Sequence, residues 1–417
     1  MKTLLKNATI VDPSSAFHLQ EVDVLIADGK IAQIGPSLSA DGTCTVVELT
    51  NLHLSPGWFD SSVSLGEPGY EERETIANGL QLAAKSGFTA IALQPNSTPV
   101  LDNQSQIQFV QNKAKGFATT LHPIGAFTKE SAGKDMAELF DMKNAGAIAF
   151  GDYSKNIDNA NILKIGMQYL HDFNGLLLLF CQDNNLKGQG IANEGIQATR
   201  LGLKGIPNLA EEIQVARALF LAEYCDGKIH LPTISTAKSV QLIQEAKAKG
   251  IRVSCSVSVH HLVLNDSCLT NFDSRYKVSP PLRAEADRLA LIEGVLNGSI
   301  DCITTDHNPI DIEHKNLEFD LAKDGTIGLE SAFGALQTVL PLDVILDKLT
   351  AGKKIFGIAA SAIEVGATAE LTLFNPVVDW VFEAPHILSK SKNAALLGHK
   401  MKGVAYGIYN QGILQLA

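Results

Sequence analysis

A small set of polar side chains stands at the ends of apolar runs, where this chain could carry out chemistry. Its members are Asp60, Ser62, Ser64, Asp152, Asp306 and His307. Two or three converging carboxylates could weakly hold Mg²⁺ or Ca²⁺, because these hard cations prefer oxygen ligands. A serine together with His307 and Asp306 could instead form a nucleophilic triad. The triad is disfavoured, because adjacent residues on one strand point to opposite faces and Asp306 could not easily orient His307.

The apolar runs alternate with helical patterns along the middle of the chain. Eight strands are predicted, at residues 57–64, 89–94, 120–126, 147–151, 176–181, 228–234, 252–257 and 302–306. Helical periodicity covers residues 73–86 and 235–249, and each pattern stops at a glycine, as helix ends commonly do. Eight such units in about 300 residues predict a closed (β/α)₈ TIM barrel rather than an open sheet.

The two ends of the chain differ from its middle. Residues 1–54 and 363–417 contain short strands separated by turn-forming residues. Neither end can bury much apolar surface alone, because a few isolated strands are marginally stable. We therefore expect both ends to pair in one small β-sandwich domain, with the barrel, at residues 55–362, inserted between them.

Composition limits the classes of protein to consider. The chain has 417 residues, of which 45% are hydrophobic, and six cysteines without a CxxC pair. This cysteine usage favours a reduced, cytoplasmic protein. The N-terminus predicts no signal peptide, and no apolar run reaches the roughly 18 residues that a membrane span needs. The net charge of −11 argues against nonspecific binding to nucleic acid.

Eight short motifs follow one another along the chain. They lie at residues 56–69 (PGWFDSSVSLGEPG), 94–99 (QPNSTP), 193–195 (NEG), 201–207 (LGLKGIP), 280–283 (PPLR), 305–307 (TDH), 328–330 (GLE) and 389–393 (SKSKN). Their order and spacing resemble those of the dihydroorotase family, in its long bacterial type, within the amidohydrolase superfamily. The resemblance covers nearly the whole chain, and it implies a barrel of the amidohydrolase type.

The resemblance also implies where a metal site would lie. Active members bind one or two Zn²⁺ at the C-terminal mouth of the barrel, where the metal activates a water and polarises the substrate amide. The matching ligand positions here are Ser62, Ser64, Asp152, Phe180, Thr233 and Asp306. Hydroxyls or a phenyl ring replace all four expected imidazoles, and these groups are poor zinc ligands or none. We therefore expect no zinc, and Asp306 to be a vestige of the catalytic aspartate.

The positions that bind substrate in the family have changed as well. The arginine that would pair with the substrate carboxylate is Gly66, although its partner Asn96 remains. Ser279 replaces an asparagine and Ile310 a histidine. Losing a bidentate arginine–carboxylate contact removes one of the stronger orienting interactions available. Asn96 and His307 are expected to be vestigial substrate-binding residues.

Because the losses affect metal, activated water and substrate anchor together, we interpret the chain as an inactive pseudo-dihydroorotase. Asp306 is expected to bond with the hydroxyls that replaced the imidazoles. The resemblance implies a scaffold for aspartate transcarbamoylase, the preceding enzyme of pyrimidine biosynthesis, and at least a homodimer. Two alternatives stay open. One is an active dihydroorotase, or another cyclic-amide hydrolase, with an atypical site. The other is a small-ligand binding module that uses the old pocket around Asn96, Asp306 and His307.

Overall fold

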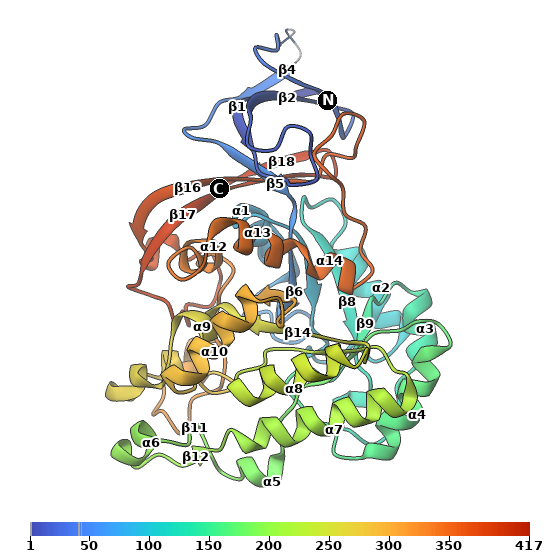
Figure 1. The fold of residues 1–417 in the computed structure, drawn as a ribbon, viewed down its shortest axis with the longest axis vertical. Helices are drawn as coiled ribbons and strands as arrows, with labels where there is room; N and C mark the ends of the chain where they lie inside the picture. The colour runs from blue at the N-terminus through green and yellow to red at the C-terminus, as the bar shows by residue number, and fades with distance from the viewer. Residues whose placement is uncertain (1, 41, 43) are drawn as a thin grey trace.

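A computed structural model describes residues 2–40, 42 and 44–417 of the chain. Figure 1 shows a small region of strands, which holds both termini, above a larger region of alternating strands and helices. Among the described residues, no helix is long and apolar enough to cross a membrane.

Eight parallel strands form the barrel in the order that was predicted. They are β6 (Trp58–Val63), β7 (Phe88–Leu93), β8 (Thr120–Gly125), β9 (Ala149–Phe150), β10 (Leu177–Leu178), β13 (Ile229–Leu231), β14 (Val253–Ser258) and β15 (Cys302–Thr304). Each strand pairs with the next one in this series. Several are shorter than predicted, because the chain turns into loops soon after each apolar run. The predicted barrel is confirmed.

The last strand closes onto the first at the mouth. Val63 and His307 form a parallel bridge, and the Ser64 amide donates to the His307 carbonyl oxygen at 2.8 Å. These contacts lie just beyond β15, so the segment after the last strand completes the ring.

A buried carboxylate reinforces this closure. Asp60 on β6 is fully buried and accepts from the Thr305 amide at 3.0 Å and from the Thr304 and Thr305 hydroxyls. It also accepts from the Ser62 amide at 3.0 Å. Burial is the largest influence on the pKa of Asp60 and raises it, whereas the four donors lower it. Asp60 therefore joins the ends of the first and last strands.

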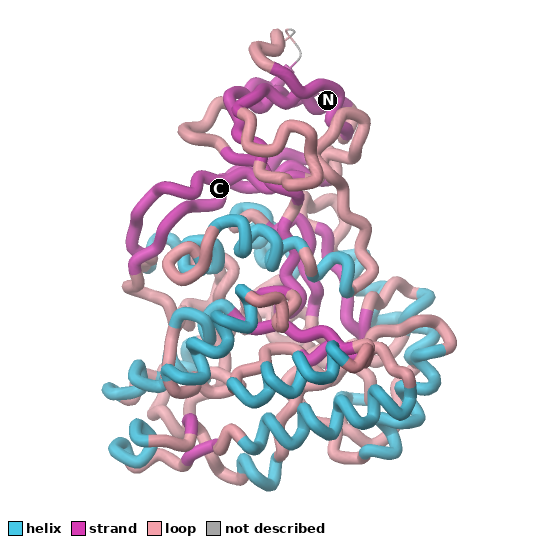
Figure 2. The backbone as a smooth tube through the Cα atoms, in the orientation of Figure 1, coloured by secondary structure: helices cyan, strands magenta, loops and turns pink. Residues whose placement is uncertain are grey.

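Helices cover the outside of the barrel (Figure 2). They are α1 (Ile76–Lys85), α2 (Gln104–Lys113), α3 (Leu139–Asn144), α4 (Ala160–His171), α5 (Asn184–Lys187), α6 (Ile196–Leu201), α7 (Leu209–Cys225), α8 (Ala237–Ala248), α9 (Val259–Val263), α10 (Glu285–Leu296), α11 (Ile312–Lys315), α12 (Ala332–Leu336), α13 (Leu342–Thr350) and α14 (Gly352–Ile355). Helix α1 begins later than predicted because the Thr75 side chain caps it by accepting from the Asn78 amide.

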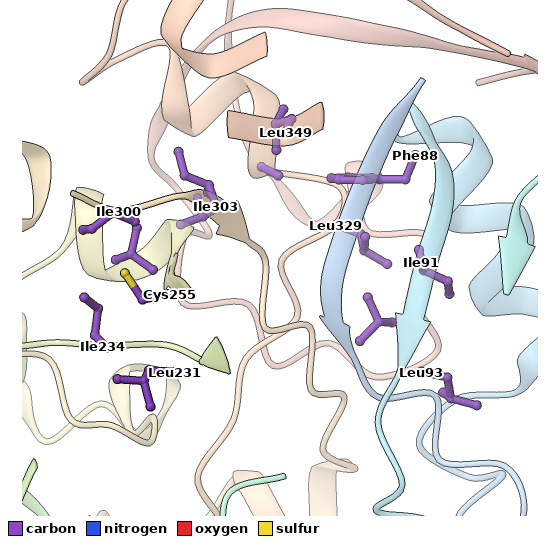
Figure 3. Close-up of a cluster of buried hydrophobic side chains, with 14 of the residues drawn as sticks. Phe88, Ile91, Leu93, Leu231, Ile234, Cys255, Ile300, Ile303, Leu329 and Leu349 are labelled. Carbon is purple, nitrogen blue, oxygen red and sulfur yellow. The ribbon is translucent and has the colours of Figure 1, made fainter. Parts of the chain in front are cut away.

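Apolar side chains fill the space on both sides of the strands. Ile91 and Leu93 of β7 pack in the large cluster between strands and helices that Figure 3 shows in part. The alternate residues Ala90 and Ala92 join a separate cluster with Phe59. Alternation along a strand places these two sets on opposite faces, so the second cluster fills the barrel interior.

Strands from both ends of the chain join one sheet. They are β1 (Lys2–Ile10), β2 (Glu21–Ala27), β3 (Lys30–Gly35), β4 (Cys44–Val47), β5 (His53–Pro56), β16 (Leu371–Val381), β17 (Lys400–Asn410) and β18 (Ile413–Leu416). Strand β5 links the two halves, since it pairs with β1 and with β16. The boundary expected at residue 54 falls inside this strand. A hydrophobic cluster of their own holds these strands together.

Asp60→Ala should destabilise the protein by about 3 kcal/mol or more, because it leaves the Thr304 and Thr305 donors buried without an acceptor. Urea unfolding followed by circular dichroism measures the effect. Asp141→Ala, at an exposed position on α3, is the control and should change stability by less than about 0.5 kcal/mol. Equal effects of the two variants would contradict a closing role for Asp60.

Candidate functional site

A small cavity lies at the ends of the barrel strands. It is lined by Ser62, Gln94, Tyr153, Ser154, Leu178, Phe180, Pro232, Thr233, Ser279 and Asp306. Four of the six positions that match the metal-ligand positions of the family, Ser62, Phe180, Thr233 and Asp306, are therefore brought together. The other two, Ser64 and Asp152, do not line this cavity.

Hydrogen bonds connect the polar side chains of the cavity into a chain. The Gln94 amide donates to Ser62 Oγ at 3.0 Å, and Ser62 Oγ donates to Asp306 Oδ1 at 2.8 Å. The Tyr153 hydroxyl donates to the same carboxylate oxygen at 3.2 Å. The expectation that a hydroxyl at a former imidazole position bonds with Asp306 is confirmed for Ser62. Tyr153 supplies the second donor that was expected from Thr233.

The Asp306 carboxyl is buried. Burial raises its pKa from 3.8 to about 6, and the bonds from Ser62 and Tyr153 oppose the rise only in part. Burial also raises the pKa of the Tyr153 phenol well above its ordinary value, and the nearby Asp306 adds to this effect. No cationic side chain is among the groups that shift the pKa of Asp306.

Phe180 and Tyr153 leave little space at this place. The cavity offers about 10 Å³ to the centre of a water-sized sphere. One water needs roughly 10–15 Å³ on this measure, whereas pockets for small molecules span about 300–1,000 Å³. The cavity therefore has room for about one water and not for a cyclic amide.

The backbone at the mouth is strained at three of the lining residues. Tyr153, Thr233 and Asp306 have φ values of 54°, 50° and 47°. Non-glycine residues in this region cost on the order of 1–3 kcal/mol, and such strain clusters at functional sites. A β-branched residue such as Thr233 is especially unusual there. The chain thus keeps an uncommon backbone where its side chains carry no ligating group other than the Asp306 carboxylate.

The three carboxylates do not converge on one point. Asp152 accepts from the Phe127 and Thr128 amides, each at 3.0 Å, and from the Thr128 hydroxyl. Asp60 is engaged with the last strand, and Asp306 with Ser62. Within residues 2–40, 42 and 44–417, no three His, Cys, Asp or Glu side chains are arranged to hold a metal ion.

His307 is fully buried and does not line the cavity. Its Nδ1 accepts from the Gly328 amide at 3.2 Å, while Nε2 has no hydrogen-bond partner. Burial lowers the pKa of His307 to about 3, so the ring is neutral near pH 7. His307 thus follows the last strand at the mouth, where it forms a bridge with Val63, and its ring is buried. The structure shows no Ser-His-Asp arrangement among these residues, because Ser62 bonds directly with Asp306.

The residues at the positions where the family binds the substrate carboxylate are Asn96 and Gly66. The Ser64 hydroxyl donates to Asn96 Oδ1 at 3.1 Å, and Asn96 is exposed. Gly66 has a φ of 68°, and a Cβ placed there would lie 2.4 Å from the Tyr70 carbonyl oxygen. An arginine at Gly66 therefore needs a different local backbone. The substrate-binding roles of Asn96 and His307 stay predictions.

Comparisons with known proteins identify the family. A family model described as "Dihydro-orotase-like" matches residues 52–239. A protein named "Dihydroorotase" from Pelotomaculum thermopropionicum is 40% identical over 413 residues, which cover 97% of this chain and 96% of the relative. The chain belongs to the dihydroorotase family. A second dihydroorotase, from Geotalea daltonii, is 36% identical over 413 residues, with 97% of each protein covered.

Solved structures support the fold of this dihydroorotase-family chain. An L-hydantoinase from Arthrobacter aurescens matches with a TM-score of 0.86 at 20% identity, over 99% of this chain and 95% of that one. A D-hydantoinase from Thermus sp. matches with a TM-score of 0.81 at 19% identity, over the same shares. At these identities the likeness shows the fold alone: an amidohydrolase TIM barrel with a separate β domain.

One dihydroorotase-family motif residue that this chain retains, Arg283, binds its own loops. It is buried, with 3% of its side chain exposed. Its Nε donates to Ser235 Oγ at 3.0 Å, and its Nη1 donates to Asn193 Oδ1 at 3.2 Å and to the Ile206 carbonyl at 3.0 Å. Its Nη2 lies 3.8 Å from Glu211. One guanidinium therefore joins four segments that are separate in the sequence, so this motif residue has a structural role.

A second retained motif near the C-terminus fixes the loop after β15. Asn393 accepts from the Ile310 amide at 3.1 Å and donates to the carbonyls of Asn308 and Gly325 at 3.0 and 3.1 Å. Ser389 donates to Glu330 through its amide at 2.9 Å and through its hydroxyl at 2.5 Å. These motifs of the dihydroorotase family therefore have a structural role in this chain.

The donor set does not fit the zinc of active dihydroorotases. Zinc prefers thiolate, imidazole and carboxylate ligands at about 2.0–2.3 Å. The former imidazole positions offer only two serine hydroxyls, a threonine hydroxyl and a phenyl ring. Asp306 is bonded to Ser62, and Asp152 has its own donors, so neither carboxylate is held open for a cation.

Sequence reasoning missed Tyr153 and Gln94. Tyr153 directly follows Asp152, so its place at the end of a barrel strand was the available signal. Gln94 ends the β7 segment in the same manner. Tyrosine and glutamine are not among the metal ligands of the dihydroorotase pattern, so a comparison with that pattern does not single out these two residues.

Asp306→Asn should stabilise the protein above pH 6. The folded-state pKa is raised, so ionisation costs stability as the pH rises from 3.8 to about 6. The gain should therefore be near zero at pH 4 and reach about 2–3 kcal/mol at pH 8. Denaturant unfolding at both pH values measures it.

Asp311→Asn is the matched control with the opposite sign. Asp311 pairs with Arg73 at 3.1 Å, and its pKa is lowered. Its substitution should cost stability at pH 8 and less at pH 4. A loss at pH 8 for Asp306→Asn as well would show that Asp306 is stabilised as an anion, contrary to this interpretation.

Proposed function

We propose that this dihydroorotase-family protein is a noncatalytic member that supports pyrimidine biosynthesis as a scaffold for aspartate transcarbamoylase. One observation carries the proposal. Ser62 and Tyr153 hydrogen-bond to Asp306 at the place where the metal and substrate of active members are expected, and Phe180 helps to fill it. A side-chain network and a cavity for about one water replace the open metal site.

The physical consequence is a missing route for amide hydrolysis. Without a metal, neither a polarised carbonyl nor a hydroxide is available at neutral pH. The imidazole of the buried His307 is neutral, and it bonds to the Gly328 amide rather than to a serine hydroxyl, so it offers no substitute base. Gly66 leaves the substrate carboxylate without its arginine.

The scaffold role is favoured because the chain retains the contacts that hold the fold together but not the imidazoles that would bind a metal. Asp60, Arg283 and Asn393 are each fully engaged in structural bonds. A chain that keeps its loops this well retains surfaces on which a partner could depend. Aspartate transcarbamoylase is proposed as the partner through the family resemblance, and the negative net charge disfavours nucleic acid.

The protein purified without chelator should contain well under one zinc per chain and should not hydrolyse dihydroorotate measurably. Elemental analysis and a turnover assay on the same sample test this. The variant Ser62→His/Ser64→His/Phe180→His/Thr233→His is the control, and it should gain zinc while turnover stays negligible, because Gly66 is unchanged. Stoichiometric zinc in the wild type, or turnover near the typical 10 per second, would refute the proposal.

Co-expression tests the scaffold. With aspartate transcarbamoylase from the same cell, the two proteins should co-elute, and the transcarbamoylase should lose activity or stability when this chain is absent. Asp306→Asn is the matched variant, since a scaffold role predicts unchanged support of the partner. A transcarbamoylase that is equally active and stable alone, and does not co-elute, would contradict the scaffold role.

A further inference from the structure

A second, larger cavity lies at the end of the barrel opposite to the mouth. Its volume is about 660 Å³ on the measure that gives about 10 Å³ at the mouth. Its lining comes from the residues at which β13, β14 and β15 start and from helices α13 and α14. Figure 1 shows these two helices on the side of the barrel that faces the terminal strands. Pockets for small molecules span about 300–1,000 Å³, so this basal cavity has room for one.

Four cationic side chains line the basal cavity, although the chain as a whole carries a net charge of −11. They come from four different segments: the residues just before β13 and β14, helix α13 and helix α14. These basal cations are Lys228, Arg252, Lys348 and Lys354. The Asp301 carboxylate also lines the cavity, but it is paired with the Lys247 amine at 2.6 Å. The cavity therefore has an excess of positive charge.

Two of the basal cations have carboxylate partners that face the solvent. Arg252 lies 3.2 Å from Asp226, and Lys348 lies 3.2 Å from Asp347. The side chains of these two aspartates are 74% and 66% exposed. Ion pairs with such exposed carboxylates contribute little to stability, because water screens them. An anion inside the cavity can therefore compete for both cations.

The other two basal cations lack an anionic partner. Within residues 2–40, 42 and 44–417, no hydrogen bond or ion pair involves the side-chain amines of Lys228 and Lys354. Ile229 pairs with Val253 in the parallel register of β13 and β14, so Lys228 and Arg252 stand side by side one residue earlier. Burial lowers the pKa of Lys228, and nearby cations, Arg252 foremost, lower it further. A bound anion would remove this repulsion between like charges.

Apolar side chains supply another part of the lining. Ile251, Ala351 and Ile355 are half-buried at the cavity wall. Lysine and arginine side chains bind phosphate oxygens through charge-assisted hydrogen bonds, and four cations suit the several negative charges of a diphosphate better than one carboxylate. The cavity is much larger than a phosphate group. An organic body can therefore lie against the apolar wall while its phosphates meet the basal cations.

From this arrangement we propose that the basal cavity is a binding site for a nucleoside diphosphate, with the diphosphate among the four basal cations and the nucleoside against Ile251 and Ile355. Active sites of TIM barrels lie at the opposite face, at the C-terminal ends of the strands. The basal cavity and the cavity at the mouth share no lining residue. Binding at the basal cavity is therefore independent of whether the protein is a catalyst or a scaffold.

Isothermal titration calorimetry of the full chain with ADP, in buffer without divalent cations, tests the site. The wild type should bind one ADP per chain, and Lys228→Gln should weaken binding by about 10-fold or more, because a charge-assisted contact is lost. The control Lys238→Gln, at an exposed lysine on α8 that does not line the cavity, changes the net charge equally and should bind ADP as the wild type does. Absence of saturable binding to the wild type, or equal affinities of the two variants, would overturn the proposal.

A second variant and a second probe test the two halves of the site separately. Ala351→Glu keeps all four cations but adds a carboxylate to the lining, so it should weaken ADP binding by about 10-fold or more, and it decides the matter should Lys228→Gln fail to fold. Inorganic pyrophosphate has no nucleoside to cover Ile251 and Ile355, so it should bind the wild type about 10-fold or more weakly than ADP. Unchanged affinity of Ala351→Glu, or pyrophosphate that binds as tightly as ADP, would overturn the assignment.

Discussion

The bonds that Asp60 accepts from the last strand are the constraint on which the rest of this structure depends. Asp60 lies on β6, and its donors are Thr304, the last residue of β15, and Thr305, which follows it. Ser62 and Asp306 are two and one residues beyond these contacts, so barrel closure alone brings them within hydrogen-bond distance. The mouth can therefore keep its shape without a metal to hold it together.

The three carboxylates near the mouth differ in the number of hydrogen-bond donors that surround them. Asp60 and Asp152 accept from several amide and hydroxyl donors, which lower their pKa values, but burial has the larger effect and leaves both pKa values raised. Asp306 has only two donors, and burial raises its pKa to about 6. In a metal site a cation would favour the charged form of such a carboxyl. In this chain, hydroxyls from Ser62 and Tyr153 provide a weaker substitute, and the strained backbone at the mouth remains.

Periodicity and turn residues predicted the strands, the closed barrel and the shared sheet of the two termini, because the spacing of apolar residues and the residues that end helices are local features of the sequence. The orientation of His307 was beyond this reasoning. Simple alternation fails where Asp306 adopts a positive φ, and the Gly328 amide that His307 contacts is distant in the chain. Phe180 follows β10 and Tyr153 follows β9, and the two side chains line one cavity. This packing depends on how the two strands sit side by side, which the sequence of either segment does not show.

The central claim is that hydrogen bonds have replaced the metal at the barrel mouth. Diffraction from crystals grown with zinc, recorded at the zinc absorption edge, tests it most directly. The account predicts no anomalous peak between Asp152 and Asp306, with Ser62 Oγ within hydrogen-bond distance of Asp306. A strong peak at that position, with Asp306 turned away from Ser62 and toward the ion, would contradict it.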